Sequence, residues 1–340
     1  MHRICGSFVR FCVDFHAVML YNICINSILK GSPGVSRTVQ GKMRLGASTN
    51  MFSNRPRAAK IPTYAAMTES LADAGFDVAE LDFGGAARDT SDGLASADWE
   101  AAVDAAGEAA ARRGLPVVQV AAPNDPFVFI RGSQPSAERV AYIREMIRRS
   151  AVAAGRLGAA WLIVQPLSDT VNCEYDTSVE LETNRAFYAP ILEVCRSAGV
   201  GLAFENTCNN AHFDLRRIYG ENPEDIIALV DSFGDASVGV CWNFGRANFM
   251  LADQGRALRK MGGRVRVTHA SDNRGEVDSR LIPFVGGNVK WEKIMPVLCE
   301  TGYEGDIVID APSYTRDFPD ELMPDAMRFA LLAGRHLLSL

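Results

Sequence analysis

The sequence repeats one local pattern eight times: a short apolar run that ends on a polar or charged residue. The runs cover residues 45–50, 76–82, 116–119, 161–165, 200–205, 237–243, 265–269 and 307–310. Each run has the length of a buried strand, and the stretches between them are long enough for a helix and a loop. Eight strand-then-helix units predict an α/β fold, the (β/α)8 TIM barrel with eight parallel strands. That fold would collect the last side chain of every strand at one mouth.

The stretches between the runs show the apolar periodicity of helices. The predicted helices cover residues 63–74, 97–113, 136–157, 181–198, 223–233, 254–261, 291–300 and 321–338. Gly75, Gly114, Gly158, Gly199 and Gly302 each follow one of these helices and precede a strand, where a left-handed cap is expected. The alternation of helix, glycine and strand supports the barrel.

An open doubly wound sheet is the alternative architecture. It would normally carry a G-x-G-x-x-G motif after its first strand, and the sequence from Gly46 does not contain one. Two connections that follow strands, 169–180 and 272–288, are longer than packing requires. We expect them to form walls or lids over the mouth.

Composition describes an ordinary globular protein that forms one domain over residues 43–340. The chain has 340 residues, 48% of them hydrophobic, and a formal net charge of −6. The acidic balance and the scattered arginines exclude nucleic acid as a partner. Eight cysteines occur without a C-x-x-C pair, which indicates reduced thiols and a cytoplasmic location.

Residues 1–42 differ in character and are predicted to be an extension outside the fold. Their apolar stretch, 17–29, contains Asn22 and Asn26 and is too short and polar to span a membrane. Met43 opens the first strand as a natural start would. A targeting segment or an element that plugs the barrel are the two alternatives.

Four polar strand ends point to a metal centre. Glu205, Asn243, His269 and Asp310 end the fifth to eighth strands, so the barrel would bring them together. A lone histidine is more often a structural hydrogen-bond partner than a ligand. Two carboxylates, an amide oxygen and an imidazole that converge would suit Mn²⁺, Mg²⁺ or Co²⁺ better than a structural zinc ion.

At these residues the chain resembles the xylose isomerase-like TIM barrel family of sugar isomerases and epimerases, which is related in fold to the apurinic-site endonucleases. The resemblance extends from Met43 to the C-terminus. The segments that carry it are GVGLAFEN at 199–206, VGVCWN at 238–243, HASDN at 269–273, GGNVKW at 286–291 and YEGDIVID at 303–310.

The resemblance implies metal ligands on the last four strands: an acid, an aspartate, a histidine and a glutamate. Glu205 and His269 match this set, Asn243 lacks the negative charge of an aspartate, and Asp310 is one methylene shorter than a glutamate. We therefore expect a degenerate site with weakened metal affinity. The endonucleases have histidines where this chain has Ala121, Gln165, Arg246 and Arg280, which excludes a three-zinc nuclease.

The resemblance also implies a reaction. The ion would polarise a sugar carbonyl, while Glu205 and Asp310 would serve as ligands and as catalytic proton carriers on opposite faces of an enediolate. Arg246 would bind an anionic group of the substrate or replace the ion as electrophile. The alternative for Arg246 is a salt bridge with a loop acid.

Further binding candidates lie on other strands. Glu80 matches a glutamate common in the family and would accept hydrogen bonds from substrate hydroxyls, or form an internal ion pair. Gln119 and Gln165 suit a hydroxyl-rich ligand or cap a strand end. Trp242 and Trp291 would stack on a sugar face or belong to the core. On the seventh loop, Asp272 and Asp278 are expected to be solvated surface acids.

The hypothesis is therefore a sugar or polyol isomerase or epimerase that acts without nucleic acid or membrane partners. A non-catalytic or metal-free carbohydrate-binding barrel is the second hypothesis. A dehydratase or lyase with related chemistry is the third. The sequence leaves open whether the barrel forms a homo-oligomer.

Overall fold

The computed structural model describes residues 43–53, 55, 60–125, 135–168, 175–209, 217–251 and 253–340. Residues 42–340 form one compact unit. The segment 1–42 lies outside the described residues, so its assignment as an extension remains a prediction. No helix of the described part is both long and apolar enough to cross a membrane.

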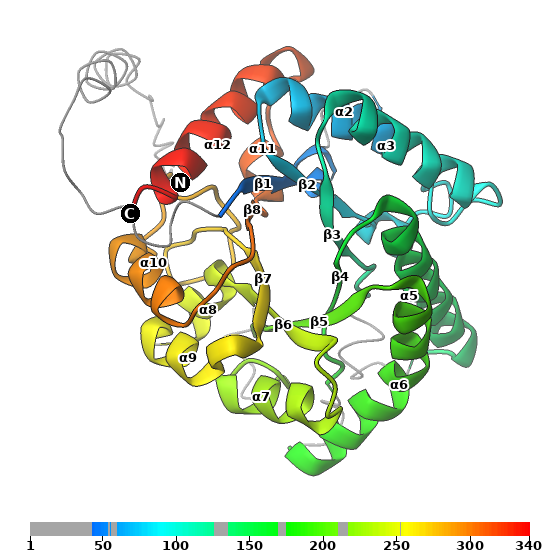
Figure 1. Cartoon of the computed structure of the whole chain (residues 1–340), viewed down its shortest axis with the longest axis vertical. Coiled ribbons are helices and arrows are strands. Elements are labelled where there is room, and N and C mark those ends of the chain that lie inside the picture. The colour runs from blue at the N-terminus through cyan, green and yellow to red at the C-terminus, as the bar shows by residue number, and fades with distance from the viewer. Residues whose placement is uncertain are drawn as a thin grey trace, which may run out of the picture. The chain divides into compact units, whose positions relative to one another are not determined.

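Eight parallel strands form the centre of this unit, as predicted (Figure 1). They are β1 (Leu45–Ser48), β2 (Val78–Asp82), β3 (Val117–Ala121), β4 (Trp161–Val164), β5 (Gly201–Glu205), β6 (Val238–Asn243), β7 (Val265–His269) and β8 (Ile307–Ile309). Their order in the sheet follows the chain, and β8 pairs with β1. A parallel bridge between Ala270 and Ile309 joins β7 to β8 and closes the barrel.

Helices surround the strands and connect each one to the next (Figure 1). They are α2 (Tyr64–Ala74), α3 (Trp99–Arg113), α5 (Ala137–Leu157), α6 (Thr177–Ala198), α7 (Pro223–Ser232), α8 (Phe244–Met250), α9 (Gln254–Met261), α10 (Trp291–Glu300), α11 (Pro312–Thr315) and α12 (Met323–Leu337). The 3₁₀ helices are η2 (Thr49–Phe52), η3 (Gly84–Ala87), η4 (Gly262–Arg264) and η5 (Asp320–Leu322). The sequence did not predict α8, which is short and follows directly on β6.

Local sequence signals explain where the helices begin and end. Thr63 and Ser136 cap α2 and α5 by accepting hydrogen bonds from backbone N–H groups of the first turn. Gly75, at φ 97°, and Gly199, at φ 70°, adopt the predicted left-handed cap at the ends of α2 and α6. These caps fix the length of each helix and therefore the point where the next strand begins.

Strand alternation divides the core into two layers. Outward side chains of the strands pack under the helices in the large cluster. Inside the barrel, a small cluster holds Ile163, Ala203, Cys241 and Val267, with Trp161 packed against it. The polar residues at the strand ends lie beyond this small cluster, at the carboxyl ends of the strands.

Trp161 needs the space that Gly201 leaves on the neighbouring strand. The two residues pair in register, and a Cβ atom on Gly201 would overlap the indole ring of Trp161. Glycine therefore permits a large ring inside a narrow barrel.

We predict that Gly201→Ala lowers the free energy of unfolding by about 1–3 kcal/mol, because the methyl group overpacks this layer. Urea denaturation measures the loss. Gly263→Ala is the control, since its Cβ would meet no heavy atom within 4 Å, and its effect should stay within about 0.5 kcal/mol. Equal losses in the two variants would contradict the packing role.

Candidate active site

His269 lies at the centre of a buried polar cluster formed by strand ends. Its Nδ1 is 2.7 Å from Glu205 Oε1, and its Nε2 is 2.6 Å from Glu80 Oε2. Asp310, directly after β8, places its Oδ2 3.6 Å from the same Nδ1. The structure thus brings together Glu80, Glu205, His269 and Asp310 from four strands.

The carboxylates around His269 favour its charged form. Burial alone would lower the pKa of the imidazole, but Cys241, Glu80, Asp310 and Glu205 raise it well above its ordinary value. Burial also raises the pKa of the Cys241 thiol to about 12, so this thiol is uncharged at neutral pH. The three carboxylates therefore supply the negative charge that holds the imidazolium.

Glu205 is surrounded by hydrogen-bond donors. Arg246 donates from Nη1 to Oε2 at 2.7 Å, and Gln165 donates from Nε2 to the same oxygen at 3.0 Å. Asn243 donates from Nδ2 to Oε1 at 2.8 Å. Burial opposes ionisation, yet Arg246 and His269 hold the pKa of Glu205 well below its usual range. Glu205 is therefore an ionised carboxylate with both oxygens engaged.

Asn243 has a structural role at the start of α8 in addition to its place at the end of β6. It is the N-cap of α8, and its Oδ1 accepts a hydrogen bond from the backbone N–H of Arg246 at 3.0 Å. A backbone N–H can only donate, so the amide oxygen faces the helix and the amide NH₂ faces Glu205. Asparagine is a favoured N-cap residue, and this signal could have predicted α8.

Asp310 is paired with Asn50 and Arg280, which both donate hydrogen bonds to its carboxylate. Burial opposes its ionisation, but Arg280 and His269 lower its pKa. Arg280 has a φ of 47°, an unusual conformation for a non-glycine residue. From the sequence, Arg280 was expected only as a residue in place of a family histidine, and its position in the site was not predicted.

Asp272 organises the loop that carries Arg280. This carboxylate accepts hydrogen bonds from the backbone N–H groups of Asn273, Phe284 and Val289, at 2.8, 3.3 and 3.0 Å. It is 1% exposed, so the expectation of a solvated surface acid was wrong. Asp278, whose side chain is 5% exposed, was likewise expected at the surface and lies 3.7 Å from the Nε of Arg246.

Glu80 and Gln119 form the opposite wall of the cluster. Gln119 donates from Nε2 to Glu80 Oε2 at 2.6 Å, while Glu80 Oε1 is buried and accepts no hydrogen bond from the described residues. Asp82, two residues further on β2, is partly buried. Loss of hydration, followed by the negative charge of Glu80, raises the pKa of Asp82 to about 7.

Trp242 and Trp291 lie in the hydrophobic core, each only 1% exposed. The Trp242 indole donates to Gln254 Oε1 at 3.4 Å, and the Trp291 indole donates to Asp272 Oδ2 at 3.0 Å. Neither ring face is free for a sugar, so the prediction that the two rings stack on the substrate was wrong, and both belong to the core. Trp242 precedes the inward-facing Asn243 on β6, and strand alternation turns it toward the helices.

One group of the described residues could hold a metal ion: potential ligand atoms of Glu205, Cys241 and His269 lie within 4.8 Å of one another. The predicted four-ligand set, however, does not fit a divalent ion in this arrangement. The amide oxygen of Asn243 caps a helix, both ring nitrogens of His269 face carboxylates, and donors occupy Glu205 and Asp310. Metal ligands need free lone pairs, which these contacts use.

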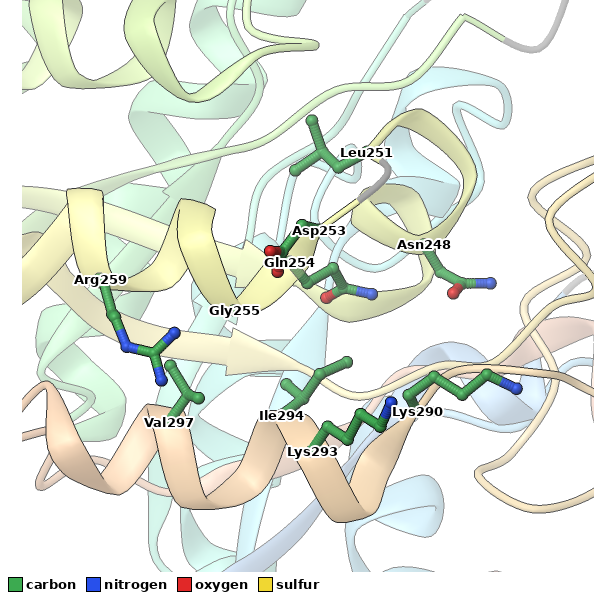
Figure 2. Close-up of a pocket in the computed structure, with 10 residues that line it drawn as sticks. All are labelled: Asn248, Leu251, Asp253, Gln254, Gly255, Arg259, Lys290, Lys293, Ile294 and Val297. Atoms are coloured by element: carbon green, nitrogen blue, oxygen red, sulfur yellow. The ribbon is translucent and has the colours of Figure 1, made fainter.

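A separate cavity of about 440 Å³ lies between α8, α9 and α10 (Figure 2). Its lining includes Asn248, Gln254, Arg259, Lys290 and Lys293, and no residue of the His269 cluster. Buried, mutually bonded titratable groups are the stronger sign of chemistry. We therefore take the cluster, and not this cavity, as the candidate site.

Comparison with known proteins agrees with this barrel. A family model described as xylose isomerase-like TIM barrel matches residues 69–331. The apo structure of 3-keto-D-glucoside 4-epimerase from E. coli is similar with a TM-score of 0.64 and 15% identity, covering 87% of this chain and all of that one (100%). A D-tagatose 3-epimerase-like protein gives a TM-score of 0.65 and 19% identity over 87% of this chain and 98% of that protein. At these identities the likeness shows the fold.

A curated relative is also similar in sequence. It is an uncharacterised protein, y4fM, from Sinorhizobium fredii, 22% identical over 175 residues. The match covers 49% of this chain and 52% of the relative, so the chain spans about half the length of the curated relative that it matches.

We predict that Asp82→Asn raises the Tm at pH 8 and has a smaller effect at pH 4.5. The ordinary pKa of this carboxyl is 3.8 and its pKa in the fold is about 7. Between these values the folded protein binds a proton that the unfolded chain has lost, so stability falls as pH rises through this window. The asparagine removes that loss, and thermal denaturation at the two pH values measures it.

Asp235→Asn provides a control of opposite sign. Hydrogen bonds from the Ser237 backbone, and then from Arg196, lower the pKa of Asp235 to about 2. This carboxylate stabilises the fold above its unfolded pKa, so the substitution should lower the Tm at pH 8. A lower Tm for Asp82→Asn at pH 8 would contradict the raised pKa.

Proposed function

Since the chain belongs to the xylose isomerase-like TIM barrel family, we propose that it isomerises or epimerises a sugar or polyol by proton transfer next to a carbonyl, through an enediolate. One observation carries the proposal. Two buried carboxylates, Glu205 and Asp310, both approach Nδ1 of His269, at 2.7 and 3.6 Å. Paired carboxylates at the mouth of a barrel are suited to remove and return a proton.

The reaction conserves protons and electrons within the site. One carboxylate takes the proton from the carbon beside the carbonyl, and the C–H electron pair moves to the carbonyl oxygen as the enediolate forms. The second carboxylate is also ionised, so it first takes a proton from the His269 imidazolium, whose Nδ1 lies 2.7 Å from Glu205 and 3.6 Å from Asp310, and delivers it to carbon, on the other face for an epimerisation. The proton held by the first carboxylate then passes to His269 and restores the imidazolium. Glu205 and Asp310 perform these two steps in the proposal.

The low pKa values of both carboxylates set a condition on this chemistry. Arg246 on Glu205, and Arg280 on Asp310, keep each carboxylate ionised but weakly basic. In the proposal, the substrate oxygen draws the guanidinium groups away from the carboxylates. The carboxylate that loses its arginine becomes the stronger base, so substrate binding and activation of the base are one event.

Substrate hydroxyls would be held by the remaining polar groups. The unbonded Glu80 Oε1 would accept from a hydroxyl, which would satisfy a buried oxygen. Gln119 and Gln165 would donate hydrogen bonds to neighbouring hydroxyls and accept hydrogen bonds from them. Similar structures include 3-keto-D-glucoside, D-psicose and L-ribulose epimerases, which makes ketoses and keto-glycosides the first substrates to test.

A metal-dependent form of the same reaction is the second candidate, favoured by the grouping of Glu205, Cys241 and His269. In that form Mn²⁺, Mg²⁺ or Co²⁺ would also contact Asn243 and Asp310 and polarise the carbonyl. The hydrogen bonds that occupy these donors argue against it. A carbohydrate-binding barrel without catalysis is favoured only by the low basicity of the two carboxylates.

We predict that the protein exchanges a carbon-bound hydrogen of at least one ketose with deuterium from D₂O and forms the epimer or isomer. D-Fructose, D-psicose, D-tagatose, L-ribulose and a 3-keto-glucoside are the probes, and NMR measures both processes. Glu205→Gln and Asp310→Asn should each lower the rate at least about 100-fold, because each removes a proton carrier.

Glu300→Gln is the matched control, since Glu300 is an exposed acid on α10 paired with Arg259, and its rate should equal that of the native protein. Wild-type rates in Glu205→Gln and Asp310→Asn would contradict the assigned proton carriers. Binding of a sugar without exchange would support the carbohydrate-binding barrel instead.

A further inference from the structure

Cations of the protein itself pair with three acids of the cluster. Glu205 pairs with Arg246 at 2.7 Å, Glu80 with His269 at 2.6 Å, and Asp310 with Arg280. Arg246 has Asp278 3.7 Å from its Nε as a further acid. A buried carboxylate without a compensating charge would be strongly destabilising, so these cations are what allows the acids to be buried.

The two arginines occupy the positions from which an ion would have to be bound. Arg246 covers Oε2 of Glu205, and Arg280 contacts Oδ2 of Asp310. A divalent ion bound to these two oxygens would have to displace both guanidinium groups. The side chain of Arg246 is only 9% exposed, so a displaced guanidinium group would need another acceptor within the site in place of solvent, which a substrate oxygen offers and a metal ion does not.

The Nε atoms of Arg246 and Arg280 are buried and make no hydrogen bond to any residue in the described part of the chain, although that of Arg246 lies 3.7 Å from Asp278 Oδ2. Burying a donor without a hydrogen bond is destabilising, and a ligand oxygen that accepts from it would recover this loss. The planar guanidinium also presents several N–H groups at once, which suits two adjacent oxygens on a substrate.

We infer that Arg246 and Arg280 take the place of a divalent cation in this site and make the reaction independent of metal. The two guanidinium groups hold the carbonyl oxygen and its neighbouring hydroxyl, and they stabilise the negative charge of the enediolate. The inference rests on the proposed function and assigns its electrophile. The proton still moves from carbon to one carboxylate, and the other carboxylate, protonated by His269, returns a proton to carbon.

The first test concerns the native protein without substrate. Elemental analysis after equilibration with Mn²⁺, Mg²⁺ and Co²⁺, followed by desalting, should find far less than one ion per chain. None of the ions should raise the Tm, since only an ion that binds the native state would stabilise it. One tightly bound equivalent with a raised Tm would overturn the inference and leave the proposed function untouched.

The second test gives the site back a ligand set. Asn243→Asp with Arg246→Gln restores a negative charge and frees an oxygen of Glu205, so this variant should gain Mn²⁺ binding that the native protein lacks. Arg259→Gln, at an exposed arginine, is the control and should gain none. A native protein that binds Mn²⁺ as tightly as the double variant would overturn the inference.

The third test uses turnover. With a ketose that the native protein converts, a chelator should not change the rate, and Arg246→Gln and Arg280→Gln should each lower it at least about 100-fold. The rate of Arg246→Lys, which keeps the positive charge but loses the planar guanidinium group, should lie between the rates of the native protein and Arg246→Gln. Thermal denaturation checks that each variant folds.

Native rates in both glutamine variants would overturn the role of the arginines. Loss of activity in chelator, restored by Mn²⁺, would also overturn it. A metal-free protein that converts no ketose would instead refute the proposed function, while the ion-free site stands on the first two tests.

Discussion

The bridge that His269 forms between Glu205 and Glu80 is the interaction on which the rest of the site depends. Carboxylates accept hydrogen bonds and cannot donate them when ionised, so a histidine between two of them serves as a cation. It holds together acids from β2 and β5 that would otherwise repel each other inside the barrel. The fold makes this possible because parallel strands end at one mouth.

Around this bridge the protein supplies its own positive charge. Arg246 reaches Glu205 from α8, whose first turn is capped by Asn243. Arg280 reaches Asp310 from the loop after β7, which is organised by the buried carboxylate of Asp272. Gly287 is part of this loop because any Cβ there would overlap the Asp272 side chain. Local capping and loop geometry thus decide the electrostatics of the mouth.

The strand ends could be predicted from sequence, and the contacts between them could not. A short run of apolar residues that ends at Glu205 or His269 predicts both a buried strand and the polar residue at its end. The alternation of side chains along a strand could have shown that Trp242 faces away from Asn243, and the favoured N-cap could have revealed α8. The position of Arg280 depends on a residue with positive φ in a long loop, for which a single sequence offers no pattern. The family resemblance gave the fold correctly, and the ligand set that it implies does not fit the hydrogen bonds observed here.

A crystal structure of the protein grown in excess Mn²⁺, with data collected at the manganese absorption edge, tests the central claim most directly. We expect no anomalous peak at the mouth, with Arg246 and Arg280 still bound to Glu205 and Asp310. An anomalous peak coordinated by Glu205, His269 and Asp310, with the arginines displaced, would contradict the account.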